Sequence, residues 1–160
     1  MKNNSKNSVL LIFLVITCAA GVHAQTVRQT AGITERAMTM SGNFAFASVG
    51  DLMIRRPASQ LADPDVQEVF DLIRSADLAM GNMEGELANL REFEGPLNNF
   101  VGTHEVAEDL KLMGFDMVNR AQNHLLDSEI AGMFSTNSLL DEAGLIHAGS
   151  GKNLHEAAAP

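Results

Sequence analysis

Short apolar segments alternate with longer segments of helical periodicity across most of the sequence. An amphipathic helix, a glycine and an apolar run follow one another twice, in LKLMGFDMV and in LLDEAGLIHAG. Glycine often ends a helix because it accepts the left-handed backbone found at helix C-termini. Strands joined by helices of this length form right-handed crossovers, which make the sheet parallel. The sequence therefore predicts an α/β fold with helices packed on a parallel sheet.

Four buried strands are expected where apolar runs are short and end in polar or glycine residues. They are predicted at residues 43–49, 77–82, 115–121 and 145–149. Between the second and third strands, residues 85–102 contain glycines and a proline, which predict a long irregular loop. Loops of that length in a compact domain are more often functional than idle.

Three helices are expected between these strands. The first should begin at Asp63-Pro64 and end near Ser75, because aspartate caps a helix and proline suits its first turn. The second should be capped by Thr103 and end at Gly114, and the third should run from Ser128 to Gly144. Helical spacing predicts inward-facing apolar residues on all three: Val66, Val69, Phe70, Ile73, Val106, Leu110, Met113, Ile130, Met133, Phe134 and Leu140.

The first 24 residues have the pattern of a secretory signal peptide. Two lysines precede the apolar run VLLIFLVITCAAG, which is too short to span a membrane comfortably, and VHA offers small residues for cleavage after Ala24. We therefore expect an exported protein, with residues 25–41 as a linker and residues 42–160 as one domain. The alternative is a lipoprotein signal acylated at Cys18, which Thr17 disfavours because a small glycine or alanine is usual there.

Composition excludes several classes of function. Cys18 is the one cysteine, so cleavage after Ala24 would leave none and a disulfide framework would be impossible. The formal net charge of −9 argues against nucleic acid and anionic lipid as partners. An acidic surface is compatible with cation binding but is usual in any soluble protein.

Polar side chains follow each predicted strand at the point where it ends. Asp51 follows the first strand, and Asn82 and Glu84 follow the second. The third strand is followed by Gln122, Asn123, His124 and Asp127. The carboxyl ends of parallel strands share one edge of the sheet, where ligands bind in open α/β folds. Carboxylate, amide and imidazole groups suit divalent Mg, Mn, Fe or Zn ions, and a nearby histidine can protonate a leaving group.

Structural interpretations of the same residues stay open. Asp51 suits a turn, Asn82 tolerates a left-handed backbone, and Glu84 can be a solvated acid. Asp127, just before a helix, is first a cap or turn residue. Three other histidines, at positions 104, 147 and 155, are expected to be surface or packed residues, and Gly149-Ser150-Gly151 is only a loose match to an anion-binding loop.

Three motifs in order, SVGDLMI, ADLAMGNMEGEL and GFDMVNRAQNHLLDSEIAG, resemble the CapA family of capsule-synthesis proteins. The resemblance implies a role in poly-gamma-glutamate capsule production. It also implies a layered sandwich fold of the calcineurin-like metallophosphoesterase type. By this resemblance Asp51, Asn82, Glu84 and Asn123 are metal ligands and His124 is the catalytic acid.

Two residues depart from the family pattern, and the family domain is longer than this sequence. Gln122 stands where a second asparagine is usual, and Glu129 stands where a glycine is common. The family domain continues past Pro160, so the chain resembles the amino-terminal half of that domain, an incomplete sandwich. A two-metal centre built from these residues alone would lack ligands, and we expect the chain by itself to be inactive as an enzyme.

Two functions of different classes follow from these observations. The first is an exported capsule-synthesis protein with a metallophosphoesterase-like metal site, acting on an acidic polymer or its precursor beside capsule-assembly proteins at the membrane. The alternative is a non-catalytic envelope factor that binds or exports the acidic polymer. A nucleotide-binding domain is disfavoured because no Gly-x-Gly-x-x-Gly sequence follows the first strand.

Overall fold

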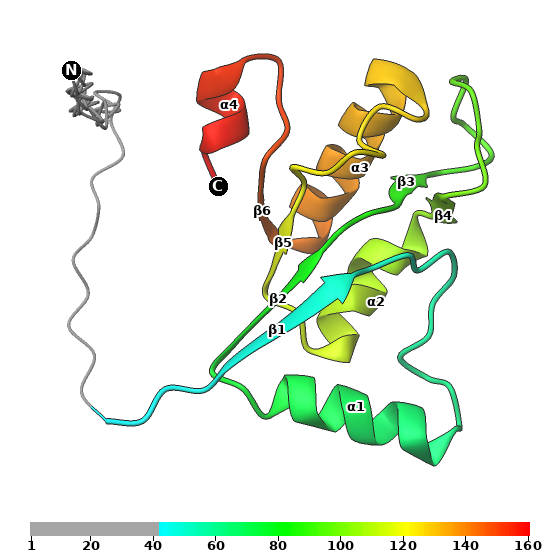
Figure 1. Ribbon diagram of the computed structural model, residues 1–160. Coiled ribbons are helices and arrows are strands. Elements are labelled where there is room, and N and C mark those ends of the chain that lie inside the picture. Colours follow the sequence, from blue (N-terminus) through cyan, green and yellow to red (C-terminus); the bar gives the residue numbers. More distant parts are fainter. Residues whose placement is uncertain (1–41) are drawn as a thin grey trace, which may run out of the picture. The chain divides into compact units, whose positions relative to one another are not determined.

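A parallel four-stranded sheet forms the centre of residues 42–160, the part of the chain described by the computed structural model (Figure 1). Its strand order is β1-β2-β5-β6, and every neighbouring pair is parallel. The strands are β1 (Phe46–Asp51), β2 (Leu78–Asn82), β5 (Met117–Asn119) and β6 (Ile146–Ala148). The predicted α/β fold with a parallel sheet is therefore confirmed.

The signal peptide and linker predictions fall on residues 1–41, outside the described residues. Within residues 42–160, the longest helix is too short and too polar to cross a bilayer.

Four helices complete the described chain: α1 (Pro64–Arg74), α2 (Glu105–Met113), α3 (Glu129–Ala143) and α4 (Leu154–Ala158). The first begins where predicted, because the Asp63 carboxylate accepts a 3.0 Å hydrogen bond from the Asp65 N–H. Gly114 and Gly144 end α2 and α3 with φ angles of 107° and 68°, as the repeated helix-glycine-strand order predicts.

The hydrophobic core lies between one face of the sheet and helices α1, α2 and α3. Ala79 and Val118 contribute from the sheet, and each helix adds buried residues: Ile73 from α1, Val106, Leu110 and Met113 from α2, and Leu140 from α3. Burying such side chains contributes about 1.5–3 kcal/mol each. Predicted inward-facing residues of all three helices therefore do form the core. The prediction was wrong for Val69 and Ile130, which are 52% and 62% exposed.

The opposite face of the sheet is apolar and only partly covered. Phe46 and Ile146 are 50% and 47% exposed. Met80 and Met117 lie in the row that runs across the sheet from Ser48 to Ile146. The prediction of a buried first strand at residues 43–49 is therefore wrong in two respects. The strand starts three residues later, and it is an edge strand whose residues are exposed or half-buried.

A second, two-stranded parallel sheet lies within the segment predicted to be irregular. It pairs β3 (Glu86–Ala88) with β4 (Val101–Thr103). Three residues are too few to show a periodicity, which is why the sequence pattern missed both strands. β3 is anchored to α3, because the Leu87 N–H donates to the Thr136 hydroxyl at 2.8 Å.

Helix starts were the less accurate predictions. Thr103 ends β4 instead of capping a helix, and His104 occupies the N-cap position of α2 without a side-chain hydrogen bond. Ser128 does stand at the N-cap of α3, but its side chain does not cap that helix.

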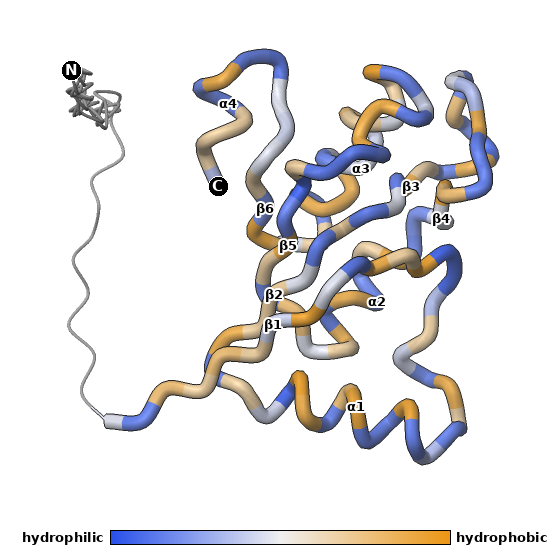
Figure 2. Tube along the Cα trace, viewed as in Figure 1, coloured by the Kyte–Doolittle hydropathy of each residue, from blue (hydrophilic) through white to orange (hydrophobic). Residues whose placement is uncertain are grey.

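The strands β2 and β5 change along their length from apolar residues at their starts to hydrophilic residues at their carboxyl ends (Figure 2). This polar edge is the place where the sequence predicts a site.

Candidate functional site

An irregularity in β1 brings Asp51 beside Asn82. Ser48 pairs with Met80, but Asp51 pairs with Asn82, so β1 has one residue more than β2 between these two pairs. An extra residue shifts the alternation of side chains and re-aims the next one. Asn119 continues the row by pairing with Asn82 on its other side. Three polar residues from three strands therefore lie side by side at the carboxyl edge.

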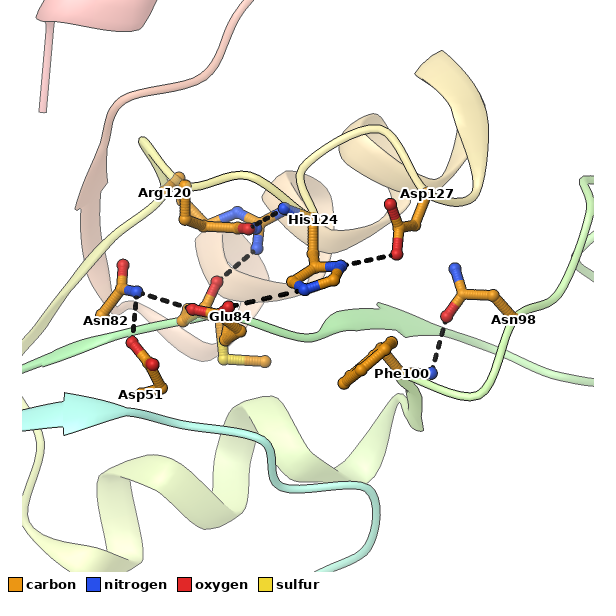
Figure 3. A network of polar contacts seen from close by, with 10 residues as sticks. Asp51, Asn82, Glu84, Asn98, Phe100, Arg120, His124 and Asp127 are labelled. Atoms are coloured by element: carbon orange, nitrogen blue, oxygen red, sulfur yellow. Dashed lines mark hydrogen bonds and ion pairs between the residues drawn. The ribbon is translucent and has the colours of Figure 1, made fainter.

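The Asn82 amide lies between two carboxylates (Figure 3). Its Nδ2 donates to Asp51 Oδ1 at 2.7 Å and to Glu84 Oε2 at 2.9 Å. Its Oδ1 accepts from the Asn119 Nδ2 at 2.7 Å, and this bond fixes the orientation of the Asn82 amide. The structure thus brings Asp51, Asn82 and Glu84 together around one point.

Glu84 is the buried member of this group, with 8% of its surface exposed. Burial raises the pKa of Glu84 most, and the hydrogen bond and negative charge of Asp51 raise it further. His124 opposes this pKa shift through its positive charge. Two acids that share a site in this way favour a neighbouring cation or proton.

His124 is held on three sides. Its Nδ1 donates to Asp127 Oδ2 at 2.7 Å, and its ring stacks on Phe100 with centroids 4.5 Å apart. Its Nε2 faces Glu84 Oε1 at 3.7 Å (Figure 3). The hydrogen bond to Asp127 is the main reason that the pKa of His124 is raised, and the charges of Asp127, Glu84 and Asp51 raise it further against the effect of burial. The arrangement therefore favours the protonated form of the ring, whose Nε2 faces the carboxylates.

Asn123 is not brought into this network. It is exposed in the turn before α3, and none of the hydrogen bonds within residues 42–160 joins its side chain to Asp51, Asn82 or Glu84. Across those residues, no three Asp, Glu, His or Cys side chains gather closely enough to hold a metal ion. The ligand set implied by the resemblance is therefore assembled only in part.

Several residues of the site were not singled out as functional from the sequence. Asp127 was interpreted as a cap or turn residue, and its contact with His124 was not expected. Phe100 comes from the segment predicted to be irregular, where Asn98 Oδ1 accepts from the Phe100 N–H at 2.6 Å. Asn119 lies inside the strand predicted at 115–121, and its polar side chain in that run was the one signal available in the sequence.

The other three histidines of residues 42–160 lie away from this network. His147 lies in β6 with its Nε2 3.0 Å from Asp141 Oδ1, and His104 faces Glu105 at 3.4 Å. His155 is exposed on the short helix α4.

The donor set suits a hard divalent cation in its chemistry. Asp51 and Glu84 supply carboxylate oxygens that already converge, and Asn82 adds an amide. The amide now presents its NH₂ to both carboxylates. Binding a cation at that point would require the Asn82 amide, and the Asn119 amide behind it, to turn so that oxygen faces the ion.

Comparison with known proteins gives curated relatives of much greater length. Two uncharacterised proteins of Sinorhizobium fredii (strain NBRC 101917 / NGR234), y4sH and y4uA, are each 38% identical over 122 residues, which is 72% of this chain and 26% of the relative. The PGA biosynthesis protein CapA of Bacillus subtilis (strain 168) is 29% identical over 133 residues, covering 78% of this chain and 35% of that protein. The chain thus spans about a quarter to a third of these relatives.

The family comparison covers nearly all of the described residues. The model of the bacterial capsule synthesis protein PGA_cap matches residues 45–160. This segment contains the strand-end residues Asp51, Asn82, Glu84, Asn123 and His124. The resemblance drawn from the three motifs is confirmed, and the chain belongs to the PGA_cap, or CapA, family of bacterial capsule synthesis proteins.

Proposed function

We propose that this chain is an exported CapA-type protein that acts in poly-gamma-glutamate capsule synthesis through a divalent cation at the carboxyl edge of its sheet. One observation carries the proposal: the Asp51 and Glu84 carboxylates converge on one point, 2.7 and 2.9 Å from the same amide nitrogen. Like charges are costly to gather unless a cation or proton neutralises them. Poly-gamma-glutamate or its precursor is the proposed substrate because of family membership.

The residues present divide into holding and proton-transfer roles. Asp51, Glu84 and a turned Asn82 amide would hold the cation, with Asn123 as a further ligand if the turn that carries it closes over the site. A bound divalent cation supplies Lewis acidity and lowers the pKa of bound water. Asp127 accepts from Nδ1 of His124 and favours the charged ring, in which Nε2 also carries a proton. Nε2 is therefore placed to protonate a leaving group beside Glu84.

Metal content and hydrolysis test the proposal. The full-length protein is purified and its metals are measured by mass spectrometry. Phosphodiesterase and peptidase activities are assayed for Asp51→Ala and His124→Ala. Asp51→Ala is expected to lose metal, and His124→Ala is expected to keep metal but lose activity. His104→Ala is the matched control, because His104 is a half-buried histidine outside the network. Metal and activity that persist in both site variants would refute the proposal.

The alternative is a non-catalytic envelope factor that binds or exports the acidic polymer. It is favoured by the separation of the candidate ligands, since no three acidic or histidine side chains of residues 42–160 form a ready metal cluster. The net charge of −9 disfavours direct polyanion binding, so cations would have to bridge the two. Polymer binding that is unchanged by excess chelator would support a metal-free binding protein instead.

We also propose that the family domain is a layered sandwich and that the protein is exported. The half-covered apolar face with Phe46, Met80, Met117 and Ile146 supports a further layer, because apolar sheet faces are normally buried. A structure of the y4sH relative with this face in solvent would contradict the sandwich. N-terminal sequencing of the secreted protein tests export, with residue 25 expected first.

A further inference from the structure

The Arg120 side chain is fully buried beside the candidate site (Figure 3). It follows β5 directly, and its backbone N–H donates to the Ala148 carbonyl at 2.7 Å. Its Nη1 donates to the carbonyl oxygens of Met83 and Gly85, each at 3.0 Å. These two carbonyls belong to the residues on either side of Glu84 in the chain.

Burying a charged guanidinium at this position costs free energy. Burial lowers the pKa of Arg120 to about 10, and the charge of Glu86 offsets only part of that effect. The Arg120 Nε and Nη2 atoms and the Glu86 Oε1 atom are buried without hydrogen-bond partners in the described structure. Apolar residues of similar volume often stabilise a core as well as a buried charge does. Stability alone therefore gives no reason for arginine here, whereas the two bonds from Nη1 do.

We propose that Arg120 is a positioning residue that fixes the backbone on both sides of Glu84 and so aims the Glu84 carboxylate at Asp51 and Asn82. This inference rests on the proposed function, because Glu84 would have to point at Asp51 and Asn82 in order to hold the cation. The Met83 carbonyl belongs to the peptide that enters Glu84, and the Gly85 carbonyl belongs to the peptide that leaves Gly85, so the two bonds hold this short segment at both ends. The direction of the Glu84 Cα–Cβ bond is thereby restrained.

The backbone around Glu84 has few other restraints. The Met83 N–H donates to the Asn119 carbonyl at 3.0 Å, and the Gly85 N–H makes a longer 3.4 Å bond to the Leu52 carbonyl. Glu84 itself lies beyond the end of β2, where no strand pairing holds it. Removing the Arg120 bonds is therefore expected to loosen this segment in particular.

Metal affinity gives the first test. Arg120→Met keeps a long side chain but removes the donors, and Arg120→Lys keeps the charge but replaces the planar group. Mn²⁺ binding to the secreted protein is measured by titration calorimetry. Residues that orient metal ligands typically contribute about 10–100-fold in affinity, and a loss in this range is expected for Arg120→Met, with a smaller loss for Arg120→Lys. Glu86→Gln is the matched control, because it removes the neighbouring charge and leaves both Nη1 bonds; its affinity is expected to stay within about twofold of the parent, below that range.

Hydrogen exchange of the metal-free protein gives a second test that does not depend on the cation. In Arg120→Met, the Met83 and Gly85 amides are expected to exchange at least about tenfold faster, while the buried Leu110 amide of α2 is unchanged. Equal acceleration at all three amides would make Arg120 a general stability residue and overturn the inference, as would no change at any of them. Absence of Mn²⁺ binding by the parent protein would defeat the proposed function, whereas the exchange measurement would still decide the role of Arg120.

Discussion

Replacing Glu129 by glycine is expected to give a more stable protein than replacing it by alanine. Glu129 is the first residue of α3 and has a φ of 60°, and no other non-glycine residue in 42–160 has a positive φ. A left-handed backbone costs an L-residue about 1–2 kcal/mol, a cost that glycine does not bear. The resemblance to the family implies a glycine at this position, and the positive φ of Glu129 gives that expectation a physical reason.

The magnitude follows from two opposing contributions. In a normal helical position glycine is about 0.8–1.0 kcal/mol less stable than alanine, because glycine has more freedom in the unfolded chain. At residue 129 the same cost is opposed by relief of about 1–2 kcal/mol of strain, which leaves glycine ahead by up to about 1 kcal/mol. Both variants remove the Glu129 carboxylate, so its interaction with the helix dipole cancels in the comparison.

Glu68 provides the control because it is an exposed glutamate inside α1. Glu68→Gly is expected to be about 0.8–1.0 kcal/mol less stable than Glu68→Ala, the reverse order. Urea unfolding of the four variants is followed by circular dichroism in EDTA, so that metal binding does not shift the midpoints. A difference of 1 kcal/mol moves the midpoint by about 0.3–1 M. If glycine were less stable than alanine by the same margin at both sites, the left-handed conformation at Glu129 would be refuted.

Asp127→Asn is expected to lower the pKa of His124, because the hydrogen bond to Asp127 is the main cause of the raised pKa. An NMR titration of the His124 ring measures this pKa. An unchanged pKa would contradict the contact. The raised pKa of His124 stabilises the folded protein fully below the unfolded-state pKa, and this stabilisation is lost as pH rises through the folded-state pKa. In Asp127→Asn, the free energy of unfolding should therefore differ less between mildly acidic and mildly alkaline pH. Asp109→Ala should destabilise by roughly 3–5 kcal/mol in urea unfolding, since its buried carboxylate accepts from the N–H groups of residues 58 and 59 and from the hydroxyl of residue 59. Asp109→Asn keeps most of these bonds and should lose less; equal losses would show that packing matters more than hydrogen bonding. Thr136→Val leaves the buried N–H of β3 without its partner and should cost about 1–3 kcal/mol, and a neutral result would mean that β3 finds another acceptor.

The sequence predicted the parts of the fold that depend on neighbours in the chain. Asp63 and the two glycines that end α2 and α3 act within one helical turn, so their roles could be inferred from position alone. The parallel sheet followed from the alternation of strands and helices. The pairing of β3 with β4 joins two three-residue segments across an intervening loop, and no periodicity of either segment indicates it.

For the site, topology predicted the meeting of separate strand ends but not the contacts. Asp51, Asn82 and Glu84 meet because parallel strands share a carboxyl edge, as expected. The extra residue in β1 that aims Asp51 depends on the register between strands, which composition does not show. Asp127 was interpreted as a local cap because its sequence position allows a cap equally well.

The segment after β2 shows why Glu84 cannot be placed from local sequence. Residues 83–88 are buried, and buried backbone groups must be hydrogen-bonded, yet β2 has ended and β3 has only one strand neighbour. Their partners come from distant side chains: Arg120 binds the carbonyls around Glu84, and Thr136 binds the N–H of Leu87. The backbone that carries Glu84 is therefore held in part by side chains at least 35 positions away in the chain. Substitutions of Arg120 or Thr136 should therefore alter the geometry of the site more than substitutions of the exposed residues of α1 do.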